Sequence, residues 1–160
     1  MSTVRITIAL ALGLGACASD RAPDPGVDAA PASTDEAQLA PQGHAALTTW
    51  LAAGHYRAWA CELAPHPARP PGAHGMNRIC SNAALSASAA GPYPVGAVAV
   101  KELFTSSGAP NGFAVARKLD AGWYWYELYG SSVVADGVGA GLCVSCHEDA
   151  PRDHVFTRVE

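Results

Sequence analysis

The chain has 160 residues, a length that suits one folded domain with its own hydrophobic core. Only 15% of the residues are charged, and 10 lysines and arginines against 14 aspartates and glutamates give a formal net charge of −4. This balance argues against a basic surface, so we expect no nucleic-acid partner and no electrostatic attachment to a membrane.

Residues 1–16 predict a lipoprotein signal peptide. Arg5 supplies a short positive region, and the apolar run 6–15 is too short for a permanent membrane span. The run ends in Leu-Gly-Ala-Cys, which resembles the bacterial lipobox, so Cys17 is expected to carry a lipid. An ordinary secretory peptide cleaved near Ala18, with Cys17 incidental, is the alternative. Both readings predict export, and a lipidated Cys17 predicts a periplasmic lipoprotein held at the outer membrane only by its lipid anchor.

Residues 17–43 are rich in Ala, Pro, Asp, Ser and Thr and show no apolar periodicity. Such a composition buries too little apolar surface to offset the entropy cost of ordering it. We therefore expect a lipidated flexible tether over residues 17–43 and a folded domain over residues 44–160.

The folded domain is expected to begin with a helix over residues 45–60, where apolar side chains recur at near-helical spacing. Four prolines predict a loop over residues 64–75. An Ala/Ser stretch over residues 82–90 predicts a short helix.

Two strand-prone stretches follow. Residues 95–104 alternate between the two faces of a strand, and residues 112–129 predict two strands that turn near Asp120. In the first strand Lys101 shares a face with Ala97 and Ala99, opposite a face rich in valine.

The segment Cys143-Val-Ser-Cys146-His147 matches C-x-x-C-H, the attachment signature of c-type haem. Two thiols at this spacing reach both vinyl groups on one porphyrin edge, and the following imidazole reaches the iron as an axial ligand. A zinc site would need two further ligands at short spacing, and only His154 lies nearby. A thioredoxin-like pair belongs after an early strand. The motif therefore predicts one covalent haem c, bound through Cys143 and Cys146, with His147 as the metal ligand.

Together these elements predict an α+β fold: an antiparallel β-sheet with an N-terminal helix and a short C-terminal haem-bearing helix. With Cys17 assigned to lipid and the motif to haem, Cys61 and Cys80 remain. An even number of remaining cysteines in an exported protein predicts a disulfide between them. Two unpaired buried thiols are the alternative.

Three segments together resemble cytochrome P-460 and its relatives, the cytochromes c′-β. They are residues 93–104 (YPVGAVAVKELF), 122–127 (GWYWYE) and 143–157 (CVSCHEDAPRDHVFT). The likeness covers most of residues 48–158 and keeps one order along the chain. It implies a small β-sheet haem fold, usually a homodimer, with His147 on one face of the iron and an open distal face. It also implies a small nitrogenous or diatomic ligand and a soluble redox partner.

The enzymes of this family oxidise hydroxylamine, often with nitric oxide in the cycle, and join a lysine covalently to the haem edge. The matching position is Lys101, whose alanine neighbours would form a flat floor for a porphyrin; a solvent-facing Ala/Lys side is the alternative. The c′-β relatives lack this cross-link and bind nitric oxide or carbon monoxide under an apolar cap. Phe104 and Phe113 are candidates for the cap, and packing in the core is the alternative expected for either. The resemblance thus implies a haem oxidoreductase acting on hydroxylamine or nitric oxide, with non-catalytic gas binding or plain electron transfer as alternatives.

The chain is shorter than these enzymes in the turn before the aromatic strand, where their distal acid lies. Asp120 and Glu127 are the candidate catalytic carboxylates, with a turn residue and a solvated strand residue as the respective alternatives. Arg78 resembles a family arginine near the haem and would pair with a propionate, and Asn77 is an equal contender.

The remaining candidates are expected to have supporting roles. Asp153 is expected to fix the end of the haem-bearing helix, and Trp123 and Trp125 to pack beside the porphyrin. The other histidines are expected to be surface or loop residues rather than second axial ligands: His44, His55, His66, His74 and His154.

Overall fold

The structure is a computed structural model, and it describes residues 39–160. The predicted signal peptide, the expected lipid site at Cys17 and most of the tether lie outside the described residues. Ala40 is fully buried, and its carbonyl accepts a hydrogen bond from Arg117. The packed domain therefore begins ahead of the boundary expected at residue 44. Within residues 39–160, no helix combines the length and apolar character needed to cross a bilayer.

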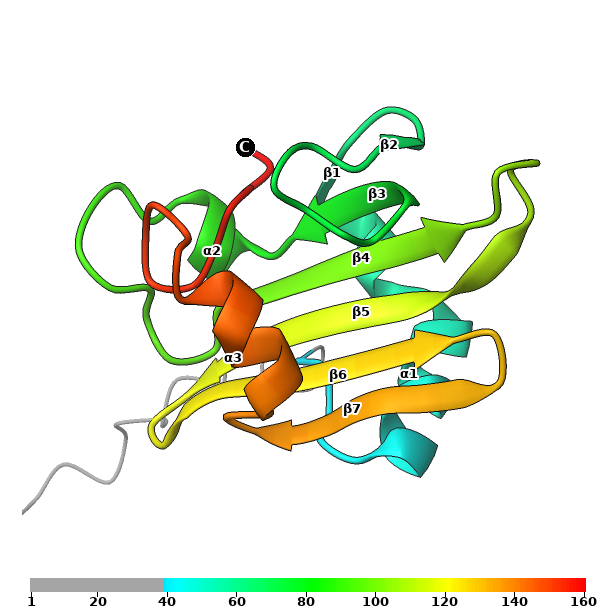
Figure 1. Cartoon of the computed structure of the whole chain (residues 1–160). Helices are drawn as coiled ribbons and strands as arrows, with labels where there is room; N and C mark the ends of the chain where they lie inside the picture. Colours follow the sequence, from blue (N-terminus) through cyan, green and yellow to red (C-terminus); the bar gives the residue numbers. More distant parts are fainter. Residues whose placement is uncertain (1–38) are drawn as a thin grey trace, which may run out of the picture. The chain divides into compact units, whose positions relative to one another are not determined.

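A seven-stranded antiparallel sheet forms the centre of the domain (Figure 1). Its spatial order is β1-β3-β4-β5-β6-β7, and β2 pairs separately with β3. The strands are β1 Ala60–Cys61, β2 His66–Pro67, β3 Met76–Ser81, β4 Val98–Phe104, β5 Pro110–Leu119, β6 Gly122–Tyr129 and β7 Ser132–Val138. The predicted combination of a few helices with an antiparallel sheet is confirmed.

Four short helical segments flank the sheet: α1 His44–Ala53, the 3-10 turn η2 His55–Ala58, α2 Ala83–Ser86 and α3 Gly141–His147. In Figure 1, α3 crosses in front of the sheet and α1 lies behind it. The prediction of one helix over residues 45–60 is wrong beyond Ala53. Gly54 adopts a left-handed conformation, with φ of 72°, and its N–H bonds to the carbonyl of Leu51, which ends the helix.

The hairpin predicted over residues 112–129 is confirmed as β5 and β6, which turn at Asp120 and Ala121. The predicted strand over residues 95–104 is shorter than expected and begins at Val98. Sequence analysis did not predict β3, whose MNRICS sequence has no clear alternation, or β7, which contains an Asp-Gly pair.

The sheet face toward α1 is closed by large apolar side chains. Leu47, Trp50 and Leu51 of α1 pack with Val98 and Val100 of β4 in one buried cluster. Tyr56, Val115, Tyr124 and Tyr126 belong to the same cluster. Because this face is filled, it forms the main core of the domain.

The opposite face is apolar only at one end. There, Trp123 and Trp125 pack with Leu85, Tyr93 and Val155. Cys143 and Val144 of α3 lie against the same cluster, although no residue of α3 is itself fully buried. The haem-bearing helix expected from the sequence therefore rests on the aromatic end of β6.

Cys61 and Cys80 face each other in register on β1 and β3, with their Sγ atoms 2.05 Å apart. The structure therefore brings the two expected partners to disulfide distance. The bond joins residues that are 19 apart in sequence. It links β1 to β3, the strand that follows the proline-rich loop.

We predict that replacing Cys61 and Cys80 together with serine lowers the free energy of unfolding by about 3 kcal/mol, because the open chain regains the entropy of a loop of this size. Denaturant unfolding monitored by tryptophan fluorescence measures the change. Reductant should lower the stability of the wild type to the same extent and leave the double variant unchanged. If the wild type and the double variant were equally stable in the absence of reductant, the proposed disulfide would be contradicted.

Candidate haem site

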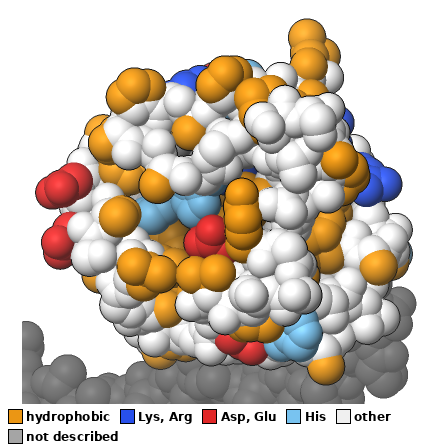
Figure 2. Space-filling view, turned by 45° about the vertical axis from the view of Figure 1, so that its right-hand side comes forward, with side chains coloured by type: hydrophobic (Ala, Val, Ile, Leu, Met, Phe, Trp, Pro, Cys, Tyr) orange, Lys and Arg blue, Asp and Glu red, His pale blue; other side chains and the backbone are white. Residues whose placement is uncertain are grey.

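A cavity of about 760 Å³ lies between α3, the loop of residues 68–75 and the sheet face away from α1. Its volume falls within the range of roughly 300–1,000 Å³ typical of sites for small molecules and cofactors. Figure 2 shows a hollow on one face of the molecule, with histidine and acidic side chains inside it and apolar side chains around it. The cavity is therefore large enough for a cofactor and mixed in chemistry.

Small side chains create the space above the sheet. In one cross-strand row, Ala116 of β5 lies between Ala99 and Trp125. In the next row, Ala114 lies between Lys101 of β4 and Glu127 of β6. All six residues line the cavity. The expected alanine floor beside Lys101 is thus present, with a carboxylate on the far side of the same row.

All three chemical groups of the C-x-x-C-H motif line this cavity. Cys143 and Cys146 are unbonded thiols, one half-buried and the other exposed. Burial raises the pKa of the Cys143 thiol to about 11, so it is protonated at neutral pH and is a poor redox nucleophile. This environment disfavours a thioredoxin-like role for the pair.

A hydrogen bond fixes the protonation of the His147 ring. Its Nδ1 lies 2.7 Å from the carbonyl oxygen of His154, which can only accept, so Nδ1 donates. The neutral ring then carries its lone pair on Nε2, and burial keeps the pKa of His147 below its usual value. A neutral imidazole with Nδ1 bonded to a carbonyl is the usual state of a histidine that ligates a metal through Nε2.

A left-handed turn aims that carbonyl at His147. Asp153 and His154 have φ of 39° and 65°, values that non-glycine residues adopt only at a cost of order 1–3 kcal/mol each. The Asp153 carboxylate accepts hydrogen bonds from the backbone N–H of Tyr93, from Trp123 Nε1 and from Lys118 Nζ, at 2.8–3.1 Å. These bonds hold the turn, so Asp153 positions the segment after α3, whereas the sequence predicted that it fixes the end of the helix itself.

Arg152 binds the same turn to the loop before β4. Its guanidinium donates to Ser88 and to the carbonyls of Ala90 and Gly91, and it lies 4.0 Å from the ring centre of Tyr93. The His154 carbonyl that orients His147 is therefore supported by the contacts of the two residues that precede it.

Lys101 is an amine in an enclosed, largely apolar position. Desolvation lowers its pKa from the usual 10.5 to about 8, although the nearby carboxylate of Glu127 acts in the opposite direction. A substantial fraction of Lys101 is thus neutral near pH 8, the form in which an amine is a nucleophile.

Glu127 faces the cavity beside His74. The distance from His74 Nδ1 to Glu127 Oε1 is 3.5 Å, and both side chains are 18% exposed. The contact with His74 holds the pKa of Glu127 below its usual range against the effect of burial. The candidate carboxylate is therefore ionised and has a partner that sequence analysis assigned to the surface or a loop.

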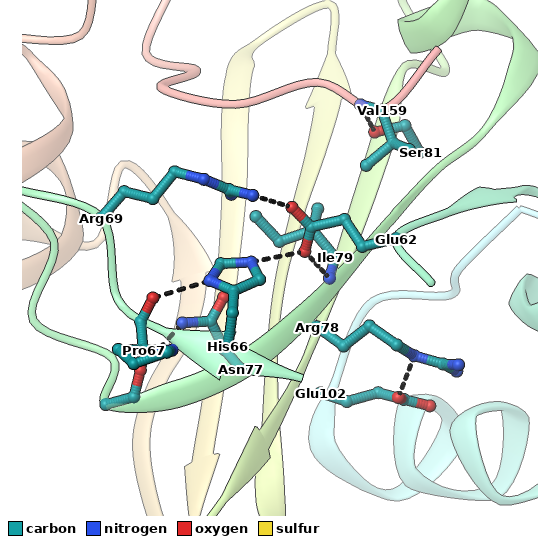
Figure 3. A network of polar contacts seen from close by, with 11 residues as sticks. Glu62, His66, Pro67, Arg69, Asn77, Arg78, Ile79, Ser81, Glu102 and Val159 are labelled. Carbon is teal, nitrogen blue, oxygen red and sulfur yellow. Dashed lines mark hydrogen bonds and ion pairs between the residues drawn. The ribbon is translucent and has the colours of Figure 1, made fainter. Parts of the chain in front are cut away.

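The loop that carries His74 is anchored at its base by Glu62 (Figure 3). The Glu62 carboxylate accepts from the N–H of Ile79 at 2.8 Å and contacts His66 Nε2 at 2.9 Å and Arg69 at 2.6 Å. These bonds keep the pKa of Glu62 low despite its burial. Proline residues of the loop and Arg69 then form part of the cavity wall.

The structure places three of the candidate residues away from the cavity. Arg78 pairs with Glu102 at 2.8 Å on the α1 side of the sheet (Figure 3), while its neighbours Asn77 and Ile79 line the cavity. The alternation of side chains along β3 is the reason. Asp120 is an exposed turn residue outside the cavity lining. Phe113 packs edge-on against Tyr56 on the α1 side, so it provides no cap over the cavity.

His74 and Phe156 also line the cavity, although neither was predicted from the sequence to do so. Phe156 lies with its ring centre 5.4 Å from that of His147. It belongs to the segment 143–157 that carries the family resemblance, so that signal could have found it. His74 follows a run of prolines with no regular spacing, and nothing in the sequence around it indicates where its side chain lies.

The residues present fit a covalent haem. Two thiols and a metal-competent imidazole line one edge of the cavity, and the alanine rows leave room for a planar ring. Trp125 also lines the cavity, and its buried Nε1 has no hydrogen-bond partner among the described residues. Among residues 39–160, no group of three or more His, Cys, Asp or Glu side chains is arranged to hold a metal ion. A haem needs no such group, because its porphyrin supplies four of the iron ligands.

Comparison of the chain with protein-family models, with curated proteins and with solved structures gives no match.

We predict that Lys101→Met stabilises the haem-free chain at pH 7 by about 1–3 kcal/mol, because the charged amine is desolvated there. The pKa of Lys101 is lower in the folded than in the unfolded chain. The free-energy cost of burying the charged amine is therefore complete below pH 8 and disappears as the pH rises toward 10.5. Urea unfolding at pH 7 and pH 10.5 measures the gain in free energy of unfolding of Lys101→Met over the wild type, which should be smaller at the higher pH. Lys118→Met is the matched control and should lose stability, because Lys118 is paired with Asp153.

We predict that Asp153→Ala lowers the free energy of unfolding by about 2–4 kcal/mol, since it leaves several donors without their charged acceptor. The same change should weaken the bond between His147 and His154, which nitrogen chemical shifts of ¹⁵N-labelled histidine report. Asp149→Ala removes an exposed carboxylate from the same segment and should change stability by no more than about 0.5 kcal/mol. An unchanged His147 signal in Asp153→Ala would show that the turn does not depend on this carboxylate.

Proposed function

We propose that this protein is an exported mono-haem c-type cytochrome of the cytochrome P-460 type that handles hydroxylamine or nitric oxide in the cavity under α3. The observation that carries the proposal is the convergence of Cys143, Cys146, His147 and Lys101 on one cavity. Lys101 and the motif come from distant parts of the sequence, and the family resemblance associates both with the haem.

The arrangement of the three resemblance segments supports the family within this proposal. The strand with Lys101 and the aromatic strand with Trp125 both line the floor, and the motif stands over them on α3. The turn at Asp153, from the third segment, orients His147. Each segment that carries the likeness thus contributes to the same site.

The haem, when bound, supplies an iron atom that binds a small ligand and exchanges electrons with it. Cys143 and Cys146 would hold the porphyrin by thioether bonds, and His147 would be the proximal ligand. Glu127, ionised and inside the cavity, is positioned to accept a proton from a ligand such as hydroxylamine. The expected homodimer, outer-membrane anchoring and soluble redox partner are part of the same proposal.

We predict that the full chain, made in a host competent for cytochrome c maturation, gains the mass of one haem and keeps its pigment in acid acetone. Cys143→Ser with Cys146→Ser should abolish the covalent addition, because no thiol remains for the vinyl groups. Replacing the Cys61 and Cys80 pair with serine is the matched control and should leave the haem attached. A colourless protein would refute the proposed function.

The optical spectrum of that holoprotein separates the functional alternatives. A strongly red-shifted ferrous Soret band that is lost in Lys101→Ala supports the cross-linked enzyme type. An ordinary high-spin spectrum unaffected by Lys101→Ala supports a gas-binding protein. A low-spin spectrum that carbon monoxide does not perturb supports a plain electron carrier.

A further inference from the structure

His74 and His147 face the same cavity from opposite elements, the proline-rich loop and α3. Their ring centres lie 6.3 Å apart, with an angle of 58° between the ring planes. An imidazole nitrogen binds a metal at about 2.0–2.1 Å, and the ring centre lies roughly 1.15 Å behind it. Two imidazoles that bind one metal from opposite sides therefore have ring centres about 6.4 Å apart. The observed separation matches that value.

The polar contacts of both rings also suit metal ligation. Nδ1 of His147 donates to a backbone carbonyl, and Nδ1 of His74 lies at 3.5 Å from the Glu127 carboxylate. In the part of the chain that the structure describes, Nε2 of neither ring makes a hydrogen bond. A carboxylate or carbonyl on Nδ1, with Nε2 free, is the arrangement found around metal-bound histidines.

The other cavity histidine near the loop shows the contrast. His66 has both ring nitrogens engaged, Nδ1 with the carbonyl of Pro67 at 2.6 Å and Nε2 with Glu62 at 2.9 Å. It therefore holds the base of the loop and has no free nitrogen to offer. His74, farther along the same loop, is the one whose Nε2 is uncommitted.

We propose that His74 is the sixth ligand of the haem iron in the resting protein, and that a small ligand must displace it to bind. This inference rests on the proposed haem site and specifies how that site is closed. It differs from the open distal face that the family resemblance implies. Glu127 then has a second role, because its contact with Nδ1 positions the His74 ring.

The test is the spin state of the resting ferric holoprotein at pH 7, measured by optical absorption and electron paramagnetic resonance. We expect a low-spin, six-coordinate spectrum in the wild type and a high-spin spectrum in His74→Ala. Added imidazole should restore the low-spin spectrum of the variant. His55→Ala, which removes an exposed imidazole from η2 on the other side of the sheet, is the control and should keep the wild-type spectrum.

Ligand binding gives an independent readout. Because the wild type binds carbon monoxide only in the fraction of molecules with His74 released, His74→Ala should raise the apparent affinity of the ferrous protein by about tenfold or more. A high-spin wild type, or a His74→Ala variant that stays low-spin without added imidazole, would overturn the inference. Either result would leave the haem addition intact, so it is distinguishable from a colourless protein, which would refute the haem site itself.

Discussion

The hydrogen bond from His147 to the carbonyl of His154 is the interaction on which the candidate site depends. It selects the ring nitrogen that remains free, and it does so through a turn that two non-glycine residues adopt at an energetic cost. The cost is offset by the charged bonds of Asp153 and Arg152 to the loop before β4 and to the hairpin of β5 and β6. The direction of one imidazole is therefore determined by strands and loops far from it in sequence.

The two faces of the sheet differ because of side-chain size. On the α1 face, valines and tyrosines meet leucines and tryptophan, and the space is filled. On the other face, Ala99, Ala114 and Ala116 occupy the positions where larger residues would touch α3 and the loop. A cavity of this size forfeits dispersion contacts along its walls, and burying Lys101 beside it costs further stability. A bound planar cofactor would restore those contacts, which gives a physical reason for the small residues.

Anchoring of the proline-rich loop connects the rim of the cavity to its interior. Glu62 binds Arg69, His66 and the backbone of β3, so the loop leaves the sheet in a defined direction. His74 then comes to lie beside Glu127. Cys61, the last residue of β1, directly precedes Glu62, and Cys80 directly follows Ile79 on β3. The disulfide therefore ties together the two segments that form this anchor.

Local patterns in the sequence predicted those features that depend on neighbouring residues. The spacing of the C-x-x-C-H motif, the alternation around Lys101 and the aromatic hairpin after residue 112 each carry a period or a chemical signature that needs no tertiary information. The antiparallel sheet and the short C-terminal helix follow from them. The end of α1 at Gly54 was predicted less well, because the apolar spacing continues beyond the glycine.

The positions of isolated polar residues were decided by the tertiary structure. Arg78 and Asn77 looked equivalent in sequence, and only the register of β3 against β4 turned the arginine toward Glu102 and the asparagine toward the cavity. Asp120 and Glu127 were both candidate carboxylates, and the hairpin placed the first in its turn and the second on the face that lines the cavity. His74 lies in an irregular loop, so its place followed from the anchor at Glu62. The sequence by itself determined which residues are candidates for haem attachment and iron ligation, since the C-x-x-C-H motif depends on residue type and short spacing. Which of them share one cavity was decided by strand register and loop anchoring, since these bring together residues that are distant in the chain.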